Sequence, residues 1–418
     1  MRLAVSLPFS GKDSYLAPIK DTDMISIYTL TSALHDEAAV RQATEGFLDS
    51  IGLEYTLKGN DFSDYGRAGL DLIFVRTGGT EGLFASLLPA LQAASQAPFY
   101  LLASNQSNSL AASMEILSYL RAAGLPGEIL HGSPEQVRER ILFLEAQARA
   151  RNALRGLRLG VIGKPSDWLI ASQADYGKVR ERLGIELSDI PMQELLDLYA
   201  SVPQIAFQDR ESTVPEAVRR SLPDAQRLFF ALKDLAVRHR LGGLTIRCFD
   251  LLTAIHNTGC LALALLNAEG TTSGCEGDVP ALLSMAIARA VTGEASFQAN
   301  PSRIDPATGE ILFAHCTVPL SIVSEYTFDT HFESGIGVGI RGKLPEGPVT
   351  VFKVSGDLSR HYVEEGELLR NTAEENLCRT QVVVRLPQTD YFLSAPIGNH
   401  HILIPGHHKA ALEALLGA

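Results

Sequence analysis

The chain has 418 residues, which is too long for one ordinary hydrophobic core, so two or three domains are expected. Hydrophobic residues make up 46% and charged residues 20%, a globular rather than a disordered composition. The net charge of −12, with no dense Lys/Arg patch, argues against nucleic acid as a partner.

No stretch reaches the roughly 18 uninterrupted apolar residues of a transmembrane helix. The N-terminal MRLAVSLPFS is unlike a signal peptide, because only a short apolar run precedes Pro8. The five cysteines are scattered without a CxxC pair, which favours buried, reduced thiols over disulfides or a zinc ribbon. These features predict a cytoplasmic protein that does not contact membranes.

The first part of the chain is predicted to alternate strands and helices. Apolar runs at 1–7, 72–76 and 98–103 are continuous, which is typical of parallel strands covered on both faces. The polar turns at 77–81 and 104–109 follow two of these strands. They would lie at the carboxyl edge of a sheet, where α/β proteins bind ligands, or they are only turns and helix caps.

A long helix is predicted from Ser133 to about residue 154, with Pro134 at its first position and Gln136 completing a capping box. A second α/β unit follows, with strands at 157–163 and 244–248 and helices at 192–199, 223–238 and 250–256. The clearest helix covers 280–292, because Pro280 lies near its start and Gly293 follows its end.

After Gly293 the pattern changes to short strand-like runs separated by Gly, Pro and Asp, at 311–319, 335–344, 349–354, 378–386 and 401–405. Helix is nearly absent until 408–416, so an antiparallel β-rich domain is expected. The predicted architecture is two doubly wound parallel-sheet α/β domains, 1–156 and 157–295, followed by a barrel-like β-rich domain over 296–418.

Two carboxylates flank a glycine just before the helix at 280. Asp278 is placed to cap this helix, and that alone would account for it. Glu276 is too early in the chain to act as a cap. Glu276 is therefore the stronger candidate for chemistry.

Histidines supply the other candidates. His315 stands in an apolar strand, where a histidine is often only a hydrogen-bonded core residue. The pair His400–His401 follows Asn399, and a second His pair comes shortly after it. Carboxylate, amide and imidazole groups together are ligands that suit Mn²⁺ or Mg²⁺.

Four runs, in this order, resemble the fucose isomerase family and its arabinose isomerase relatives: CEGDVPALLSMAIARAVTG (275–293), FQAN (297–300), AHC (314–316) and NHHILIPGH (399–407). Segments 77–81, 104–109 and 163–168 resemble the N-terminal domains of that family. The resemblance implies a three-domain subunit that forms a trimer or hexamer. It also implies conversion between aldoses and ketoses with one bound Mn²⁺.

The resemblance further implies roles for individual residues. The family binds metal through a Glu in its CE-x-D motif, an acid about two dozen positions later, and a C-terminal His. Glu276, Asn300 and His400 occupy these places, and His315 stands where the arabinose isomerases have a further His ligand. The residues expected to contact the substrate lie in the other matched segments: Thr77, Glu81, Asn105, Trp168 and His401.

Asn300 departs from the family pattern, because an amide can offer oxygen to a metal but cannot take a proton from a sugar carbon. In the family that acid helps to move a proton between C1 and C2 through an enediol. Asp278, Asp305 and Glu333 are the available replacements, and the catalytic candidates are thus Glu276, Asp278, Asn300 and Glu333.

Three functions follow from this pattern. The first is a metal-dependent aldose–ketose isomerase acting on a monosaccharide or sugar derivative. The second is a lyase, an aldolase-like enzyme or an epimerase on the same scaffold. The third is a non-catalytic sugar-binding protein, which Asn300 makes conceivable. The sequence does not identify the sugar.

Overall fold

The computed structural model describes residues 25–204 and 214–417, which form two compact units, residues 25–149 and residues 150–417. The strand expected at 1–7 lies outside the described residues. The boundary falls inside helix α4 (Pro134–Leu154). The proposed separation of 157–295 from 296–418 as two domains stays a prediction.

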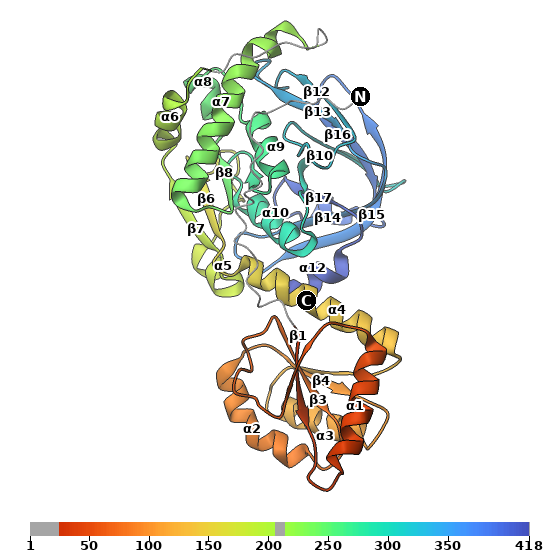
Figure 1. Ribbon diagram of the computed structural model, residues 1–418. Helices are drawn as coiled ribbons and strands as arrows, with labels where there is room; N and C mark the ends of the chain where they lie inside the picture. Colours follow the sequence, from red (N-terminus) through yellow and green to blue (C-terminus); the bar gives the residue numbers. More distant parts are fainter. Residues whose placement is uncertain (1–24, 205–213, 418) are drawn as a thin grey trace. The chain divides into compact units, whose positions relative to one another are not determined.

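The described part of the first unit is a parallel sheet with helices on both faces (Figure 1). Its strands run in the order β2-β1-β3-β4-β5. Helices α1 and α4 pack on one face through Leu48 and Ile141, and α2 and α3 pack on the other through Phe84 and Ile116. The bounds are β1 (Ile25–Leu30), α1 (Glu37–Ile51), β2 (Thr56–Gly59), β3 (Leu70–Val75), α2 (Glu81–Ala94), β4 (Phe99–Ala103), α3 (Ser109–Ala122) and β5 (Gly127–Leu130).

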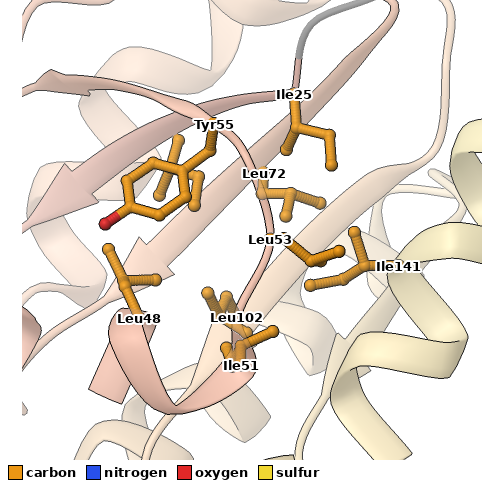
Figure 2. A pocket seen from close by; sticks show the side chains of 9 residues that line it. Ile25, Leu48, Ile51, Leu53, Tyr55, Leu72, Leu102 and Ile141 are labelled. Atoms are coloured by element: carbon orange, nitrogen blue, oxygen red, sulfur yellow. The ribbon is translucent and has the colours of Figure 1, made fainter. Parts of the chain in front are cut away.

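An apolar pocket lies between this sheet and helices α1 and α4 (Figure 2). Its lining is Ile25, Ile27, Leu48, Ile51, Leu53, Tyr55, Leu72, Leu102 and Ile141. Among these nine side chains only Tyr55 carries a polar group. A binding site for a polar ligand needs several converging polar groups, so this pocket does not suit a polar ligand.

The second unit begins with another parallel sheet, in the order β7-β6-β8-β9. Helices α6, α7 and α9 cover one face of it, and α5 and α10 cover the other. Figure 1 shows α10 between this sheet and the strands that follow, and residues 279–288 of α10 are all buried. The bounds are β6 (Arg158–Ile162), α5 (Tyr176–Leu183), β7 (Glu186–Ile190), α6 (Met192–Ser201), α7 (Glu216–His239), β8 (Gly243–Ile246), α8 (Asp250–Ala254), α9 (Cys260–Ala268), β9 (Thr272–Gly274) and α10 (Val279–Thr292).

Six of the remaining strands form a closed antiparallel barrel in the order β10-β11-β16-β15-β14-β17, and β12 and β13 form a separate two-stranded sheet. Large apolar side chains such as Phe297, Phe313 and Leu403 fill its core. The bounds are β10 (Phe297–Asp305), β11 (Glu310–His315), β12 (Glu325–Asp329), β13 (Gly339–Lys343), β14 (Gly347–Val354), β15 (His361–Thr372), β16 (Thr380–Arg385), α11 (Asp390–Ser394), β17 (His401–Pro405) and α12 (Lys409–Leu416). The predicted fold class, parallel α/β layers followed by an antiparallel barrel, is confirmed.

One predicted helix boundary is wrong. The helix expected at 223–238 begins at Glu216, so Pro223 lies inside α7 instead of at its start.

A bilayer-spanning helix would be long and apolar throughout, and none of the helices in the described residues meets both conditions.

Candidate metal centre

The loop between β9 and α10 holds Glu276 in an unusual backbone conformation. Glu276 has φ 63° and Gly277 has φ 70°, so two successive residues are left-handed. Such a φ is uncommon for a residue with a side chain, and it persists only where the surroundings impose it. The Cys275 amide donates to Gln298 Oε1 (2.8 Å), and the Ser166 amide donates to the Glu276 carbonyl (2.9 Å). The loop is therefore fixed from both sides, and Glu276 is held with it.

Two histidines from the barrel meet Glu276. His315 ends β11, and His400 directly precedes β17. Glu276 Oε1 lies 3.5 Å from His400 Nε2 and 3.9 Å from His315 Nε2, and the two imidazole rings are 5.3 Å apart. One ligand atom from each of the three side chains lies within 4.8 Å of the others. This group can hold a metal ion.

The second nitrogen of each ring has its own partner. Asp278 Oδ2 lies 2.9 Å from His400 Nδ1, and Thr317 Oγ1 lies 2.8 Å from His315 Nδ1. Histidines that bind metals usually use the other ring nitrogen in this way, which fixes the ring orientation. Nε2 of His400 is buried and has no hydrogen-bond partner among the described residues. A bound cation would satisfy this atom, so the residues fit a metal ion.

The charges of the group favour a carboxylate–imidazole cluster. Burial raises the pKa of Glu276, but His315 and His400 outweigh burial and hold that pKa well below its usual range. Burial lowers the pKa of His400, while Asp278 and Glu276 more than reverse this and raise the pKa to about 9. In His315 burial dominates and lowers the pKa. Without a cation, a proton on His400 therefore compensates the two carboxylates near neutral pH.

Aromatic rings form one wall beside Glu276. Trp168 Nε1 donates to Glu276 Oε2 (2.7 Å), and its ring packs edge-on against Phe249 at 4.8 Å. Phe249 in turn packs against the ring of His331 at 5.7 Å. Trp168 is 50% exposed, whereas His331 is buried, so this wall reaches solvent at its Trp168 end.

Glu333 lies within electrostatic reach of the cluster. Burial raises its pKa, and the negative charge of Glu276 raises it further. The residue as a whole is exposed. Glu333 is therefore a carboxylate that is electrostatically coupled to Glu276 and that water and small molecules can reach.

Asn300 lies on β10, and its Oδ1 accepts a hydrogen bond from Asn399 Nδ2 (3.0 Å). Side chains two residues apart on a strand point to the same side. Asn300 therefore faces the same side of β10 as Gln298, which holds the loop of Glu276. This placement is compatible with a role at the centre, but its role as a ligand stays a prediction.

The other two replacement acids differ sharply from Glu333. Asp278 is fully buried and caps α10 by accepting from the Ala281 amide (2.8 Å). Asp305 ends β10 and accepts from the Ala307 amide (3.0 Å) in an exposed turn. Neither carboxylate combines exposure with electrostatic coupling to Glu276.

His401 points into the barrel. Its Nε2 lies 3.0 Å from the Tyr391 hydroxyl and its Nδ1 lies 3.0 Å from the Asn399 carbonyl, so both ring nitrogens are engaged. Burial lowers its pKa to about 3. The structure thus places His401 in an aromatic core, and its expected contact with a substrate stays a prediction.

Thr77, Glu81 and Asn105 belong to the first compact unit. Thr77 is buried and its hydroxyl accepts from the Ser32 amide (2.9 Å), Glu81 begins α2, and Asn105 is exposed. The turns at 77–81 and 104–109 meet through a hydrogen bond from the amide of Gly78 to the carbonyl of Ser107 (2.8 Å). The two turns therefore share one edge of the sheet, and their role with a substrate stays a prediction.

The sequence analysis missed Lys353 and His331. Lys353 is fully buried on β14, and Nζ lies 3.5 Å from both Asp278 oxygens. The only signal for it was one lysine inside the apolar run VTVFKV. His331 is buried beside His315, and its pKa is lowered to about 4 by burial and by the neighbouring His315.

Comparison with known proteins gives three relatives, all of them sulfoquinovose isomerases. Sulfoquinovose isomerases of Priestia aryabhattai and Priestia megaterium are each 26% identical over 295 residues, which cover 67% of this chain and 66% of each relative. A third from Clostridium sp. is 26% identical over 258 residues, or 59% of this chain and 56% of that protein. All three relatives are sugar isomerases. The matched part spans just under two thirds of the length of the Priestia proteins.

The chain matches no family model. The relatives support the resemblance of the motifs to sugar isomerases in general. They do not support a resemblance to fucose isomerases in particular.

Proposed function

We propose that this protein is a metal-dependent aldose–ketose isomerase acting on a monosaccharide or sugar derivative. The observation that carries the proposal is the convergence of Glu276, His315 and His400 around Nε2 of His400, which has no hydrogen-bond partner among the described residues. The similarity to sulfoquinovose isomerases supports the same reaction class. Sulfoquinovose is therefore the first substrate to test.

The ligand set favours Mn²⁺ over Mg²⁺. Glu276 offers a carboxylate oxygen and the two histidines offer imidazole nitrogens. Mg²⁺ strongly prefers oxygen ligands, whereas imidazole suits the transition metals. A divalent cation held here would orient the oxygens on two neighbouring sugar carbons and stabilise the charge that develops on them.

Glu333 is the residue that we propose as the base in place of the acid missing at position 300. Burial and the charge of Glu276 raise the pKa of Glu333, which makes it a stronger base than an ordinary carboxylate. It would take the proton from C2 of the aldose and deliver a proton to C1 of the ketose through an enediol. The hydroxyl proton moves in the same direction, from the oxygen on C2 to the oxygen on C1, so the sugar gains and loses no atoms. Trp168 would form the wall against which the sugar packs.

The test follows deuterium in the sugar. Protein loaded with Mn²⁺ is incubated in D₂O with sulfoquinovose, fucose or arabinose, and NMR records both the ketose and deuterium at carbon. We expect exchange with at least one sugar and none with Glu333→Gln, which still binds Mn²⁺. Metal binding without exchange would support a sugar-binding protein, and carbon–carbon cleavage would support a lyase; either result contradicts the proposal.

A further inference from the structure

A buried ammonium group lies behind the metal centre. Lys353 sits on β14 with about 1% of its side chain exposed. Burying an ammonium group is costly unless an opposite charge compensates it. Among the described residues its hydrogen-bonding partner is Asp278, with both carboxylate oxygens 3.5 Å from Nζ. This lysine therefore exists in the core as half of an ion pair.

Asp278, the other half of this ion pair, contacts the metal centre through His400. Asp278 Oδ1 accepts from the Ala281 amide (2.8 Å), and Oδ2 contacts His400 Nδ1 (2.9 Å). His400 Nε2 then lies 3.5 Å from Glu276 Oε1. Lys353, Asp278, His400 and Glu276 thus form one line of charged and polar groups. In the described residues Lys353 contacts this line at Asp278, through both carboxylate oxygens.

We propose that Lys353 is a positioning residue of the metal centre. Its ammonium holds the Asp278 carboxylate in the one place from which that carboxylate fixes the His400 ring, with Nε2 directed at Glu276. Without Lys353 the carboxylate keeps the Ala281 amide and His400 but loses the buried ammonium that lies 3.5 Å from both of its oxygens. It would then turn or draw in water, and the ring of His400 would lose its fixed orientation.

This inference rests on the metal centre of the proposed function, but not on catalysis. Its test is therefore metal affinity. Trp168 is the only tryptophan of the chain, and its indole donates to Glu276. Mn²⁺, which quenches nearby fluorophores, should reduce Trp168 emission when it binds beside Glu276. Titration of fluorescence with Mn²⁺ then reports affinity in every variant, with or without turnover.

The variants separate positioning from general stability. We expect Lys353→Met and Asp278→Asn each to weaken Mn²⁺ binding about 10- to 100-fold, the usual effect of removing a group that orients a metal ligand. The double variant should bind no more weakly than Asp278→Asn alone, because Lys353 acts through Asp278. Lys353→Arg keeps the charge and should recover part of the affinity. Lys343→Met, which removes an exposed lysine paired with Glu325, should leave affinity unchanged.

Three results would overturn the inference: wild-type affinity in Lys353→Met, multiplied losses in the double variant, or a wild-type protein that binds no Mn²⁺. If Lys353→Met does not fold, Lys353→Gln and the uncharged double variant replace it, since removing both charges avoids an unpaired buried one. A wild type that binds Mn²⁺ but exchanges no sugar proton would refute the proposed function alone.

Discussion

Glu276 is the residue on which the proposed centre depends most. It supplies the anionic ligand, and its left-handed backbone aims the carboxylate between two histidines. The hydrogen bond from Trp168 occupies its other oxygen (2.7 Å). Each of these contacts limits where the carboxylate can move, so a cation would meet a ligand that is already in place.

Replacement of Glu276 by Ala should therefore remove Mn²⁺ binding in titration calorimetry. The loss should be at least about 100-fold, because two neutral imidazoles remain without an anion. Asp305→Ala is the matched control, since it removes one carboxylate from the exposed end of β10. Wild-type affinity in Glu276→Ala would show that the metal binds elsewhere.

Replacement of Asn300 by Asp should tighten Mn²⁺ binding about tenfold, because an anion would face the centre in place of a neutral amide. The new carboxylate can still accept from Asn399 Nδ2, so the local hydrogen bond is kept. Calorimetry measures the change, and Asn105→Asp adds the same charge at an exposed turn of the first unit. Equal affinity in Asn300→Asp and wild type would place position 300 outside the reach of the metal.

The affinity for Mn²⁺ should depend on pH through His400. In metal-free protein its pKa is about 9, so a cation must displace a proton from Nε2 at neutral pH. Affinity should then rise roughly tenfold per pH unit between pH 7 and 9 and level off above 9. Titrations at several pH values measure this slope. A flat profile over that range would show that His400 is not a ligand.

The proton on His400 also affects the stability of the folded protein. A rise in pH, which should strengthen Mn²⁺ binding, should weaken the stability of the metal-free protein. The pKa of His400 is raised on folding, so its contribution to the stability of metal-free protein is complete below about pH 6.5 and is lost as the pH rises through about 9. The pKa of Asp278 is lowered to about 2, because Lys353 and His400 outweigh its burial. Its contribution is complete above about pH 4 and is lost as the pH falls toward 2. Metal-free protein should therefore benefit most from this network between about pH 4 and 6.5.

At the scale of elements, local signals placed the ends of helices well. The capping box predicted for the long helix exists, with the Ser133 amide donating to Gln136 Oε1 (2.9 Å) and the Gln136 amide donating to Ser133 Oγ (3.3 Å). Asp278 caps α10, and Gly293 ends it in a left-handed conformation. These contacts involve neighbours within a few residues, so a sequence can reveal them.

Elements that depend on distant partners were placed less well. Pro223 removes one hydrogen-bond donor from α7, yet the helix continues through it. Val218, Leu222 and Ala225 carry its apolar stripe across the proline into the core of the barrel. Packing of that stripe compensates for the lost hydrogen bond. The residues around Pro223 carry no local signal for this packing, so the sequence does not predict that the helix continues.

Strand β15 was missed for a related reason. Only Val363 and Leu368 are well buried along its 12 residues, and a register shift follows Leu368, so the alternation of apolar and polar residues is broken. Charged side chains on it pair with other segments, as Arg370 does with Glu310 (2.7 Å). The strand is specified by its neighbours in the barrel rather than by its own pattern.

The loop of Glu276 should be the least tolerant turn around α10. A Cβ on Gly277 would lie 2.4 Å from the Lys164 carbonyl oxygen, whereas a Cβ on Gly293 would meet nothing within 4 Å. Both glycines have positive φ, so Ala should destabilise each by about 1 kcal/mol. Gly277→Ala should lose a further 1–3 kcal/mol, about the cost of overpacking.

Urea unfolding measures both variants, and fluorescence titration should show weaker Mn²⁺ binding in Gly277→Ala only. Equal stabilities of Gly277→Ala and Gly293→Ala would mean that segment 164–166 shifts without cost to admit the new methyl group. The loop would then not be a rigid support for Glu276.

At the scale of the whole molecule, the sequence predicted the class of fold, and three of the four predicted metal ligands have ligand atoms within 4.8 Å of one another. The sequence did not show what surrounds them. Glu276, His315 and His400 lie in motifs with recognisable neighbours. Lys353 and His331 lie in ordinary strand and loop sequence. Their importance comes from contacts with residues far along the chain, which one sequence does not display.

We expect the protein to form a trimer or hexamer, in which the turns at 77–81 and 104–109 of one subunit cover the site of a neighbour. These turns carry polar side chains at the edge of a sheet, where ligands bind in α/β proteins. Sedimentation velocity at working concentration measures the assembly. Glu81→Lys should weaken substrate binding while leaving Mn²⁺ affinity unchanged. A strict monomer would contradict the assembly.

The order of strands in the barrel also bears on when a metal can enter. Strand β17 closes the barrel between β10 and β14, and His400 directly precedes it. During synthesis Glu276 and His315 emerge long before this last ligand, so a growing chain offers only an incomplete set. Metal capture should thus follow barrel closure as a separate maturation step. Unlike a zinc finger, the chain should reach its fold in the presence of a chelator and accept its ion afterwards.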